Sequence, residues 1–572
     1  MQTARRLYVY LLSGISLGVL VTGVTLLLTV LFDRLGLGST GDLVFGGEET
    51  TRQQLTLASA LIAVSLPVWL LHWLAAERSV RPERPTAAME RTSDVRGLYM
   101  ALALGGLLAA TASGVGSTVQ GLVLRLTAGD QLGGVSGIDG GLALALAAGL
   151  AFTYHVRIRA RDWSRGPMTG GGASLPRAYL YLATFAGLFV LLGAISGLIE
   201  LAGRLLLDAA PEFIAPGDAS WWTYPLASAL SGLVVGSSIW IGHVAFADWL
   251  VRDDGWRGQS ERPARLQLAY FVAVIAVATA AVIYFVAEGA GNALAAVLGV
   301  ADAVSDAQVT GTIVLPLLTA VPYAGAWWLH ARRVRRESID LGSPERAETG
   351  DRLEVYPAAL IGLAFGAVAT AWMLSLLLEA GLGGGRLLSG DGWQREIAQF
   401  LPIALIGVAV WAWNWRSVGT RAAVDPAGEA ASTTRRAALL LVLAASVLAG
   451  IISAGTILYR LFGSLFGIDQ PTDALGELSL PIAGLVVAAA VAAYHGIALR
   501  ADQGLRAGIS TSPDQPASAP AAALMLRLSG PAEDDLERAV TMLRGHLAPG
   551  YGLEVTMASD PLPAPLPQEG SG

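Results

Sequence analysis

The chain has 572 residues, of which 53% are hydrophobic and 15% are charged, and its mean hydropathy is +0.55. Soluble globular proteins carry about a quarter charged residues, so this composition indicates a membrane protein. The absence of cysteine excludes disulfides, thiolate nucleophiles and Cys-ligated metal or iron–sulfur sites. The net charge is −7 and all 38 basic residues are arginine, a usage that we attribute to a GC-rich bacterial genome.

The apolar residues fall in blocks of about 20, the length that a helix needs to cross the hydrocarbon core of a bilayer. These blocks must be helical, because unpaired backbone groups have no water to bond with there. The first block follows Arg5 and Arg6 and is too long for a signal peptide, so we interpret it as a retained first transmembrane helix. The twelve blocks lie at residues 8–32, 54–76, 97–123, 140–157, 178–200, 222–247, 266–287, 310–331, 355–378, 397–415, 437–459 and 476–499.

The distribution of arginine predicts how these helices are oriented. Of the 38 arginines, 31 lie at the termini or in the loops after even-numbered helices, and 7 lie in the loops within helix pairs. Cytoplasmic loops carry the excess of basic residues. We therefore expect a multi-pass protein of the bacterial cell (plasma) membrane, with both termini in the cytoplasm and the lipid bilayer as its main partner.

A repeated phrase closes the even-numbered helices. "LPVWLLHWLAAERSVRP" at residues 66–82 returns as "LAFTYHVRIRARDW", "SSIWIGHVAFADW", "AGAWWLHARRVRR", "AVWAWNWRS" and "AVAAYHGIALRAD". One polar position is common to all copies, at intervals of 81 to 88 residues, and is occupied by His72, His155, His243, His330, Asn414 and His495.

The odd-numbered helices open on a matching phrase in which an arginine precedes a tyrosine. This tyrosine is lost in the sixth copy, and in the other five it is Tyr8, Tyr99, Tyr179, Tyr270 and Tyr356. Repetition at a fixed period indicates copies of one structural unit. The sequence therefore predicts six tandem helical hairpins, at about residues 1–91, 92–173, 174–261, 262–347, 348–431 and 432–500.

These phrases resemble the bacterial membrane family known as domain of unknown function 5671, whose unit is a helix pair that opens with an R-x-L-Y phrase and closes with an aromatic and His-bearing one. The resemblance covers roughly residues 5 to 500. It implies an all-α polytopic fold and brings no activity, cofactor or catalytic residue with it.

The sequence changes character after Arg500. Residues 501–520 are rich in Pro, Ser and Ala and are typical of a linker, and residues 560–572 are typical of a disordered tail. Residues 521–559 between them predict a small cytoplasmic β-α-β element. So few residues form a marginal core, so we expect this element to form homo-oligomer contacts or to bind a cytoplasmic partner.

Two hypotheses account for the six repeated polar positions. Neutral imidazole binds haem iron or metals and titrates near a pH of about 6.5. Alternatively, the positions form a belt at the headgroup level, since each lies close to cytoplasmic arginines and to aromatic residues. We expect the belt, because Asn414 is a poor substitute for an imidazole ligand. No catalytic residue, cofactor site or metal site is assigned.

Small residues concentrate in some helices, as at residues 111–121 ("TASGVGSTVQG") and 228–238 ("SALSGLVVGSS"). Small side chains let the backbones of transmembrane helices approach closely. These segments therefore predict tight helix contacts.

The sequence carries no P-loop, G-x-S-x-G, H-E-x-x-H or dinucleotide-binding motif. We therefore expect a non-enzymatic membrane scaffold or sensor that does not bind nucleic acid. Two alternatives stay open: a permease for neutral or lipid-like solutes, and a membrane redox protein with His-ligated haem.

Overall fold

The structure is a computed structural model that describes residues 2–37, 48–128, 138–207, 221–253, 255, 265–301, 305–340, 344–382, 390, 392–466 and 476–511. Every regular element among these residues is a helix. Twelve of the helices are long and apolar enough to cross a membrane. The expected all-α fold with twelve spans is therefore confirmed, and these spans indicate a multi-pass membrane protein.

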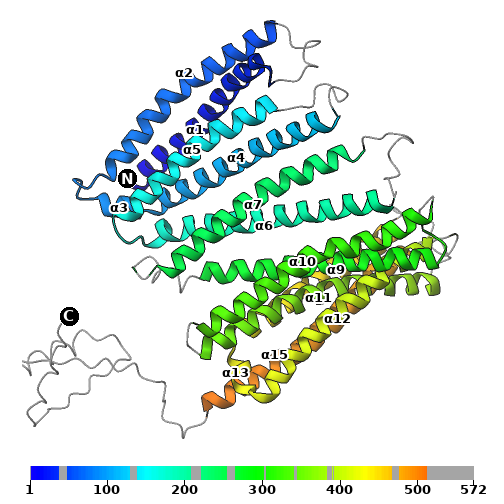
Figure 1. Ribbon diagram of the computed structural model, residues 1–572. Helices are drawn as coiled ribbons and strands as arrows, with labels where there is room; N and C mark the ends of the chain where they lie inside the picture. Colours follow the sequence, from blue (N-terminus) through cyan, green and yellow to red (C-terminus); the bar gives the residue numbers. More distant parts are fainter. Residues whose placement is uncertain are drawn as a thin grey trace, which may run out of the picture. The chain divides into compact units, whose positions relative to one another are not determined.

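The helices form six hairpins in chain order (Figure 1). The first two hairpins contain α1 (Gln2–Phe32) with the π-helical extension η1 (Asp33–Leu37), α2 (Glu48–Ser79), the short α3 (Ala87–Arg91), α4 (Asp94–Ala128) and α5 (Ile138–Ser164). The next two contain α6 (Gly170–Leu207), α7 (Thr223–Arg252), α9 (Arg265–Val297) and α10 (Asp306–Asp340). The last two contain α11 (Pro344–Leu382), α12 (Gly392–Val424), the short α13 (Pro426–Ala431), α14 (Thr433–Leu465) and α15 (Gly476–Thr511).

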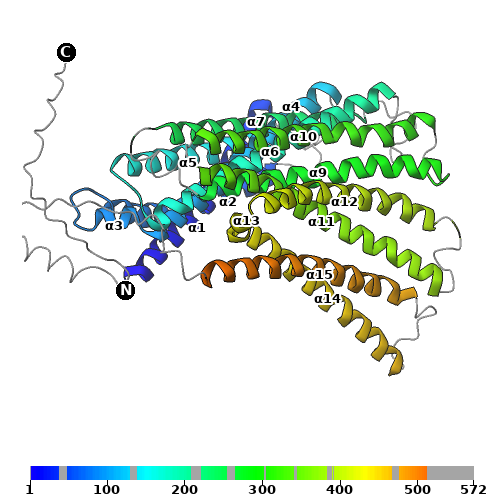
Figure 2. The same ribbon diagram turned by 90° about the horizontal axis from the view of Figure 1, so that it is seen from below.

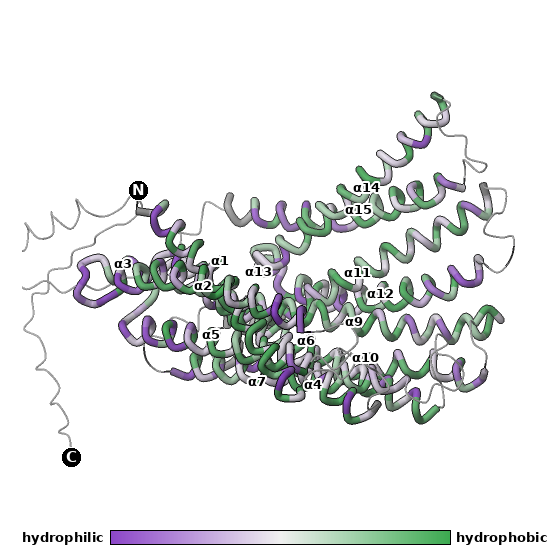
Figure 3. Tube along the Cα trace, turned by 90° about the horizontal axis from the view of Figure 1, so that it is seen from above, coloured by the Kyte–Doolittle hydropathy of each residue, from purple (hydrophilic) through white to green (hydrophobic). Residues whose placement is uncertain are grey.

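Each hairpin packs against the hairpins that precede and follow it in the chain. Helix α1 contacts α5, α4 contacts α6 and α7, α6 contacts α10, α9 contacts α11 and α12, and α11 contacts α14. Hydrophobic residues run along the helices, and hydrophilic residues gather at α3 and toward helix ends (Figure 3). The two helices of the last hairpin pack less closely than those of the others, and α14 diverges from α15 (Figure 2).

Glycines set the closest helix contacts. A Cβ on Gly141 of α5 would lie 2.8 Å from the backbone nitrogen of Thr118 in α4, and one on Gly114 of α4 would meet the backbone of Ala145. A Cβ on Gly236 of α7 would likewise meet the backbone of α6. These contacts confirm the tight packing that the small-residue segments predict, because only a residue without a side chain fits there.

The predicted linker starts later than expected. Helix α15 continues to Thr511, so residues 501–511 are helical. One cause is present: the Asp502 carboxylate binds Arg435 of α14. The chain divides into two parts after Arg506. The predicted β-α-β element (521–559) and tail (560–572) lie outside the described residues.

Candidate functional site

The repeated histidines of the even-numbered hairpins are buried and hydrogen bonded. His155, His330 and His495 are 0%, 7% and 1% exposed. Each Nδ1 lies 2.8 or 2.9 Å from the carbonyl oxygen four residues earlier, so this nitrogen carries the proton. Nε2 is then an acceptor, and the hydroxyls of Tyr99 and Tyr270 donate to Nε2 of His155 and His330 at 3.0 Å.

The same position in the odd-numbered hairpins is more open. His72, His243 and Asn414 are only partly buried, and each bonds the carbonyl oxygen four residues earlier. The Tyr179 hydroxyl donates to Nε2 of His243 at 3.0 Å. Tyr8 meets His72 through its ring alone, edge-on, with 5.5 Å between centroids.

His155, His330 and His495 lie inside the helix packing, and the belt at the headgroup level stays a prediction. The hydrogen bonds of three of the repeated histidines also disfavour metal or haem binding at those positions. A ligating imidazole needs a free lone pair, and at His155, His243 and His330 that lone pair accepts a bond from tyrosine. In the part of the chain that the structure describes, no three His, Asp or Glu side chains form a group that could hold a metal ion.

The two kinds of hairpin alternate, so the structural repeat is a pair of hairpins. We call α1 to α5 the first repeat unit, α6 to α10 the second and α11 to α15 the third. Each unit therefore contains one partly buried and one buried member of the repeated polar series.

A buried charge cluster lies among the helix ends of the first repeat unit. Arg96, at the start of α4, is 1% exposed. Its Nε and Nη2 donate to Oδ2 of Asp162 at 2.9 and 2.6 Å, and Nη2 also donates to Glu77 at 2.8 Å. Its Nη1 donates to the Tyr10 hydroxyl at 3.0 Å, and the guanidinium carbon lies 5.7 Å from the ring centre of Trp73. The cluster joins all four long helices of the unit.

The third repeat unit contains the same Arg–Asp pair and the same Arg–Trp contact. Nε of Arg435 donates to Oδ2 of Asp502 at 2.7 Å, and both side chains are buried. The guanidinium carbon of Arg435 lies 6.0 Å from the ring centre of Trp415. The Trp415 indole donates to the Tyr494 hydroxyl at 2.9 Å. Arg96 and Arg435 are therefore equivalent positions.

The short helices that join the hairpins add a second ion pair to both units. Glu90 of α3 accepts a bond from Arg6 at 2.6 Å, and Glu429 of α13 accepts one from Arg352 at 3.0 Å. Both glutamates are buried. Each pair ties the first helix of a unit to the connection between its hairpins.

These contacts correct the alignment of the fifth copy. Tyr356 follows Arg352 by four residues, as Tyr10 follows Arg6, so it is equivalent to Tyr10 and not to Tyr8. Its hydroxyl donates to Glu429 at 3.2 Å.

The sixth copy lacks the tyrosine that binds its histidine. Ala438 follows Arg435 by three residues, as Tyr99 follows Arg96, so the alanine occupies the tyrosine position. Nε2 of His495 is buried without a hydrogen-bond partner. A cavity of about 10 Å³ beside His495 has room for one water molecule at most.

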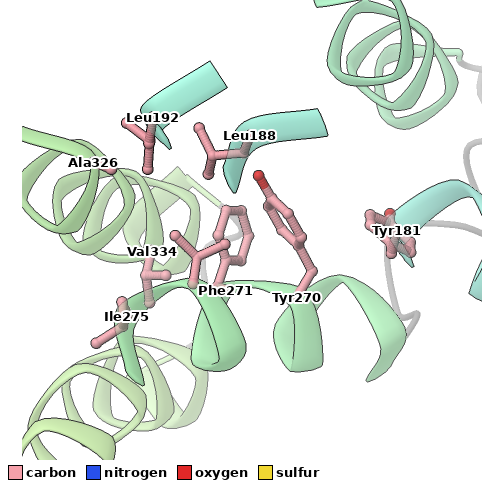
Figure 4. Packing of buried hydrophobic residues seen from close by; sticks show 9 residues of the cluster. Tyr181, Leu188, Leu192, Tyr270, Phe271, Ile275, Ala326 and Val334 are labelled. Carbon is pink, nitrogen blue, oxygen red and sulfur yellow. The ribbon is translucent and has the colours of Figure 1, made fainter. Parts of the chain in front are cut away.

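The second repeat unit has a mainly apolar interior, and its ion pair between Arg333 and Asp248 is only partly buried. Gln267 occupies the position of Arg96, three residues before Tyr270. Figure 4 shows Tyr270, Phe271 and Ile275 of α9 among Leu188 and Leu192 of α6 and Ala326 and Val334 of α10. The three units therefore share a topology but differ in how the interior is filled.

Sequence reasoning missed the Arg–Asp cluster because arginines and acids at helix ends are also typical of exposed flanks. A specific signal was present. An arginine three residues before the tyrosine position and an aspartate seven residues after the histidine occur together in the second and sixth hairpins, as Arg96 with Asp162 and Arg435 with Asp502.

Neither the curated proteins nor the solved structures contain a match to this chain. A family model does match, over residues 6–150, 177–325 and 352–490. Each match starts within the first helix of one repeat unit and ends within the fourth long helix, in agreement with a repeat of two hairpins. The chain therefore belongs to the family described as domain of unknown function 5671, in three tandem copies.

Proposed function

We propose that this protein is a non-enzymatic membrane scaffold, a row of helical hairpins that holds residues 507–572 at the cytoplasmic face of a bacterial plasma membrane. The observation that carries the proposal is that the repeated polar side chains bind one another within the helix packing. Buried polar networks with satisfied members make a fold rigid. A rigid framework suits a scaffold better than a protein that must change conformation at each turnover.

A permease for neutral or lipid-like solutes is the second candidate. It is favoured by cavities of about 560 and 890 Å³ between successive repeat units. Transporters built from repeats often hold substrate where the repeats meet. The scaffold is better supported because the hairpins pack in chain order and not around one shared centre.

Reconstitution of the full chain tests this choice. Liposomes that contain the protein are expected to take up a panel of neutral solutes no faster than empty liposomes, and the purified protein is expected to show no Soret absorption band. Uptake that depends on the protein would replace the scaffold with the permease. A Soret band would instead support the redox protein with His-ligated haem.

The orientation is tested by labelling single cysteines, for which a chain without cysteine is well suited. Arg336→Cys at the exposed end of α10 is expected to react only after the membrane is made permeable, whereas Arg52→Cys, whose native side chain is 78% exposed, is expected to react in intact cells. The reverse pattern would place the termini outside and contradict the proposed orientation.

A further inference from the structure

Successive repeat units pack against each other in the same way at two places in the chain. Helix α4 of the first unit contacts α6 and α7 of the second, and α9 of the second contacts α11 and α12 of the third. Each contact joins two different surfaces. The trailing face of a unit lies on its second hairpin and includes Ala112 and Gly116 of α4 or Ile283 of α9, and the leading face lies on the first hairpin and includes Ser231 and Val235 of α7. The row of units begins with the leading face of the first unit and ends with the trailing face of the third.

The contact between α4 and α7 depends on a glycine. Oγ of Ser231 donates to the carbonyl oxygen of Gly116 at 3.0 Å. A Cβ on Gly116 would lie 3.0 Å from the same Oγ and 3.6 Å from Cγ2 of Val235. The contact between α9 and α12 is equally close, since a Cβ on Gly291 would lie 2.7 Å from the carbonyl oxygen of Ala398. Small residues let transmembrane helices approach in this way.

The trailing face of the third unit has the same residue types, but they are exposed. Counted from the arginine that binds the buried aspartate, Gly455 of α14 takes the place of Gly116 in α4, and a Cβ on Gly455 meets nothing within 4 Å. Ile451 takes the place of Ile283 in α9 and is 63% exposed, whereas Ile283 is 1% exposed. Helix α14 also diverges from α15 (Figure 2). This face therefore resembles the two internal trailing faces and lacks the unit that covers them.

The leading face of the first unit is exposed in the same way. Counted from the repeated polar position, Ala60 and Val64 of α2 take the places of Ser231 and Val235 in α7. Ala60 is exposed, and Val64 is 68% exposed, whereas Val235 is partly buried. Alanine is small enough to meet a glycine on another helix as Ser231 does.

The two exposed faces are the two halves of one contact. Exposed apolar residues of a membrane protein normally meet lipid, which is as apolar as they are, but the chain pairs these two kinds of face with each other twice. After α15 the sequence contains no further apolar block of about 20 residues that could cover α14 within a bilayer. Each unit has four spans, so a copy that continues the row keeps the same orientation in the membrane.

We propose that the trailing face of one copy binds the leading face of a second copy, so that the row of units continues from chain to chain in the plane of the membrane. A contact between unlike faces is heterologous and can repeat into a row or close into a ring. This assembly goes beyond the scaffold proposal and does not depend on it.

Disulfide cross-linking in membranes tests the contact, because the chain has no cysteine of its own. Two differently tagged full-length chains are expressed together, one with Gly455→Cys and the other with Ala60→Cys. Their Cβ atoms would take the places of those of the Gly116 and Ser231 pair, close to the separation of about 3.5 to 4.5 Å that a disulfide needs. Oxidation is expected to join the two tags in one product. The oxidation conditions are set with Gly116→Cys and Ser231→Cys in one chain, whose two thiols should both be lost.

Two controls show whether the product reports a specific contact. Ser59→Cys places an exposed thiol next to Ala60 but about 100° around α2, so with Gly455→Cys it should form no product. In native mass spectrometry the unmodified chain should form dimers and larger species, and Gly455→Leu should shift them to monomers because its side chain fills the contact. Gly106→Leu adds the same bulk at an open position of α4 and should leave the dimers intact.

Absence of the mixed product under conditions that oxidise the internal pair would overturn the proposal, and lipid would then cover both faces. A product between two Ala60→Cys chains or two Gly455→Cys chains, in place of the mixed product, would also overturn it, since like faces would then meet. Neither result would affect the scaffold proposal, whose test is solute uptake.

Discussion

The first and second repeat units pack equivalent helices around different interiors. In the first unit Arg96 bonds Asp162, Glu77 and Tyr10. In the second unit Gln267 stands in its place and the neighbouring interior is built from Tyr270, Phe271 and aliphatic residues. The topology therefore does not require the charge cluster.

The comparison distinguishes two roles of the charge cluster: stabilising the fold and selecting one arrangement of the helices. A mainly apolar interior stabilises the second unit, so the same topology does not need a charge cluster for its stability. A buried ion pair usually adds little net stability over apolar residues of similar size, but it is costly to break. We infer that the cluster fixes one arrangement of its four helices, and the following substitutions test that view.

The largest effect is expected for Arg96→Met. This change leaves the buried carboxylate of Asp162 without its main partner, although Glu77 keeps Arg161, and it should lower the free energy of unfolding by about 3 to 5 kcal/mol. Gln267→Met in the second unit removes a neutral side chain and should cost about 1 kcal/mol or less. Unfolding in mixed micelles measures both. Similar losses in the two units would remove the distinction between them.

A smaller loss is expected for Gly114→Leu, because its side chain would meet the backbone of α5. Overpacking of a tight contact costs about 1 to 3 kcal/mol. The second unit has Phe285 at the equivalent position, so its helices already accommodate a large residue there. Gly106→Leu is the control on the same helix, since a Cβ at Gly106 meets nothing within 4 Å. If both leucine variants unfold alike, close packing at Gly114 is not the cause.

The buried histidines of the first and third units differ in the hydrogen bond at Nε2. His155→Leu removes the acceptor of the Tyr99 hydroxyl and should cost about 1 to 3 kcal/mol, the penalty for a buried polar group without a partner. His495→Leu removes a nitrogen that already lacks a partner, so it should be nearly neutral or slightly stabilising. Thermal unfolding of the two variants side by side measures the difference. A larger loss at His495 would show that its Nε2 has a partner after all.

The smallest effect is expected for Tyr8→Phe. Tyr8 is 58% exposed and contacts His72 through its ring, which phenylalanine retains. The free energy of unfolding should change by less than about 0.5 kcal/mol, as for other surface changes. Tyr99→Phe, which removes the bond to His155, should cost about 1 kcal/mol. Equal results would mean that the bond contributes nothing in the first unit.

The sequence by itself determined the twelve spans and their tandem repetition, because hydropathy over about 20 residues decides whether a helix enters a bilayer. It also marked the tyrosine and histidine positions and the tight contact at Gly114. These properties depend on a residue and its near neighbours in the chain.

Tertiary structure alone decided which of these residues meet. Tyr99 and His155 are 56 residues apart, and Arg96 and Asp162 are 66 apart. Sequence reasoning aligned Tyr356 with Tyr8 because both follow an arginine, whereas the packing aligns it with Tyr10. Whether a polar side chain at a helix end faces water or the interior depends on the helix beside it, and the sequence of its own helix does not contain that information.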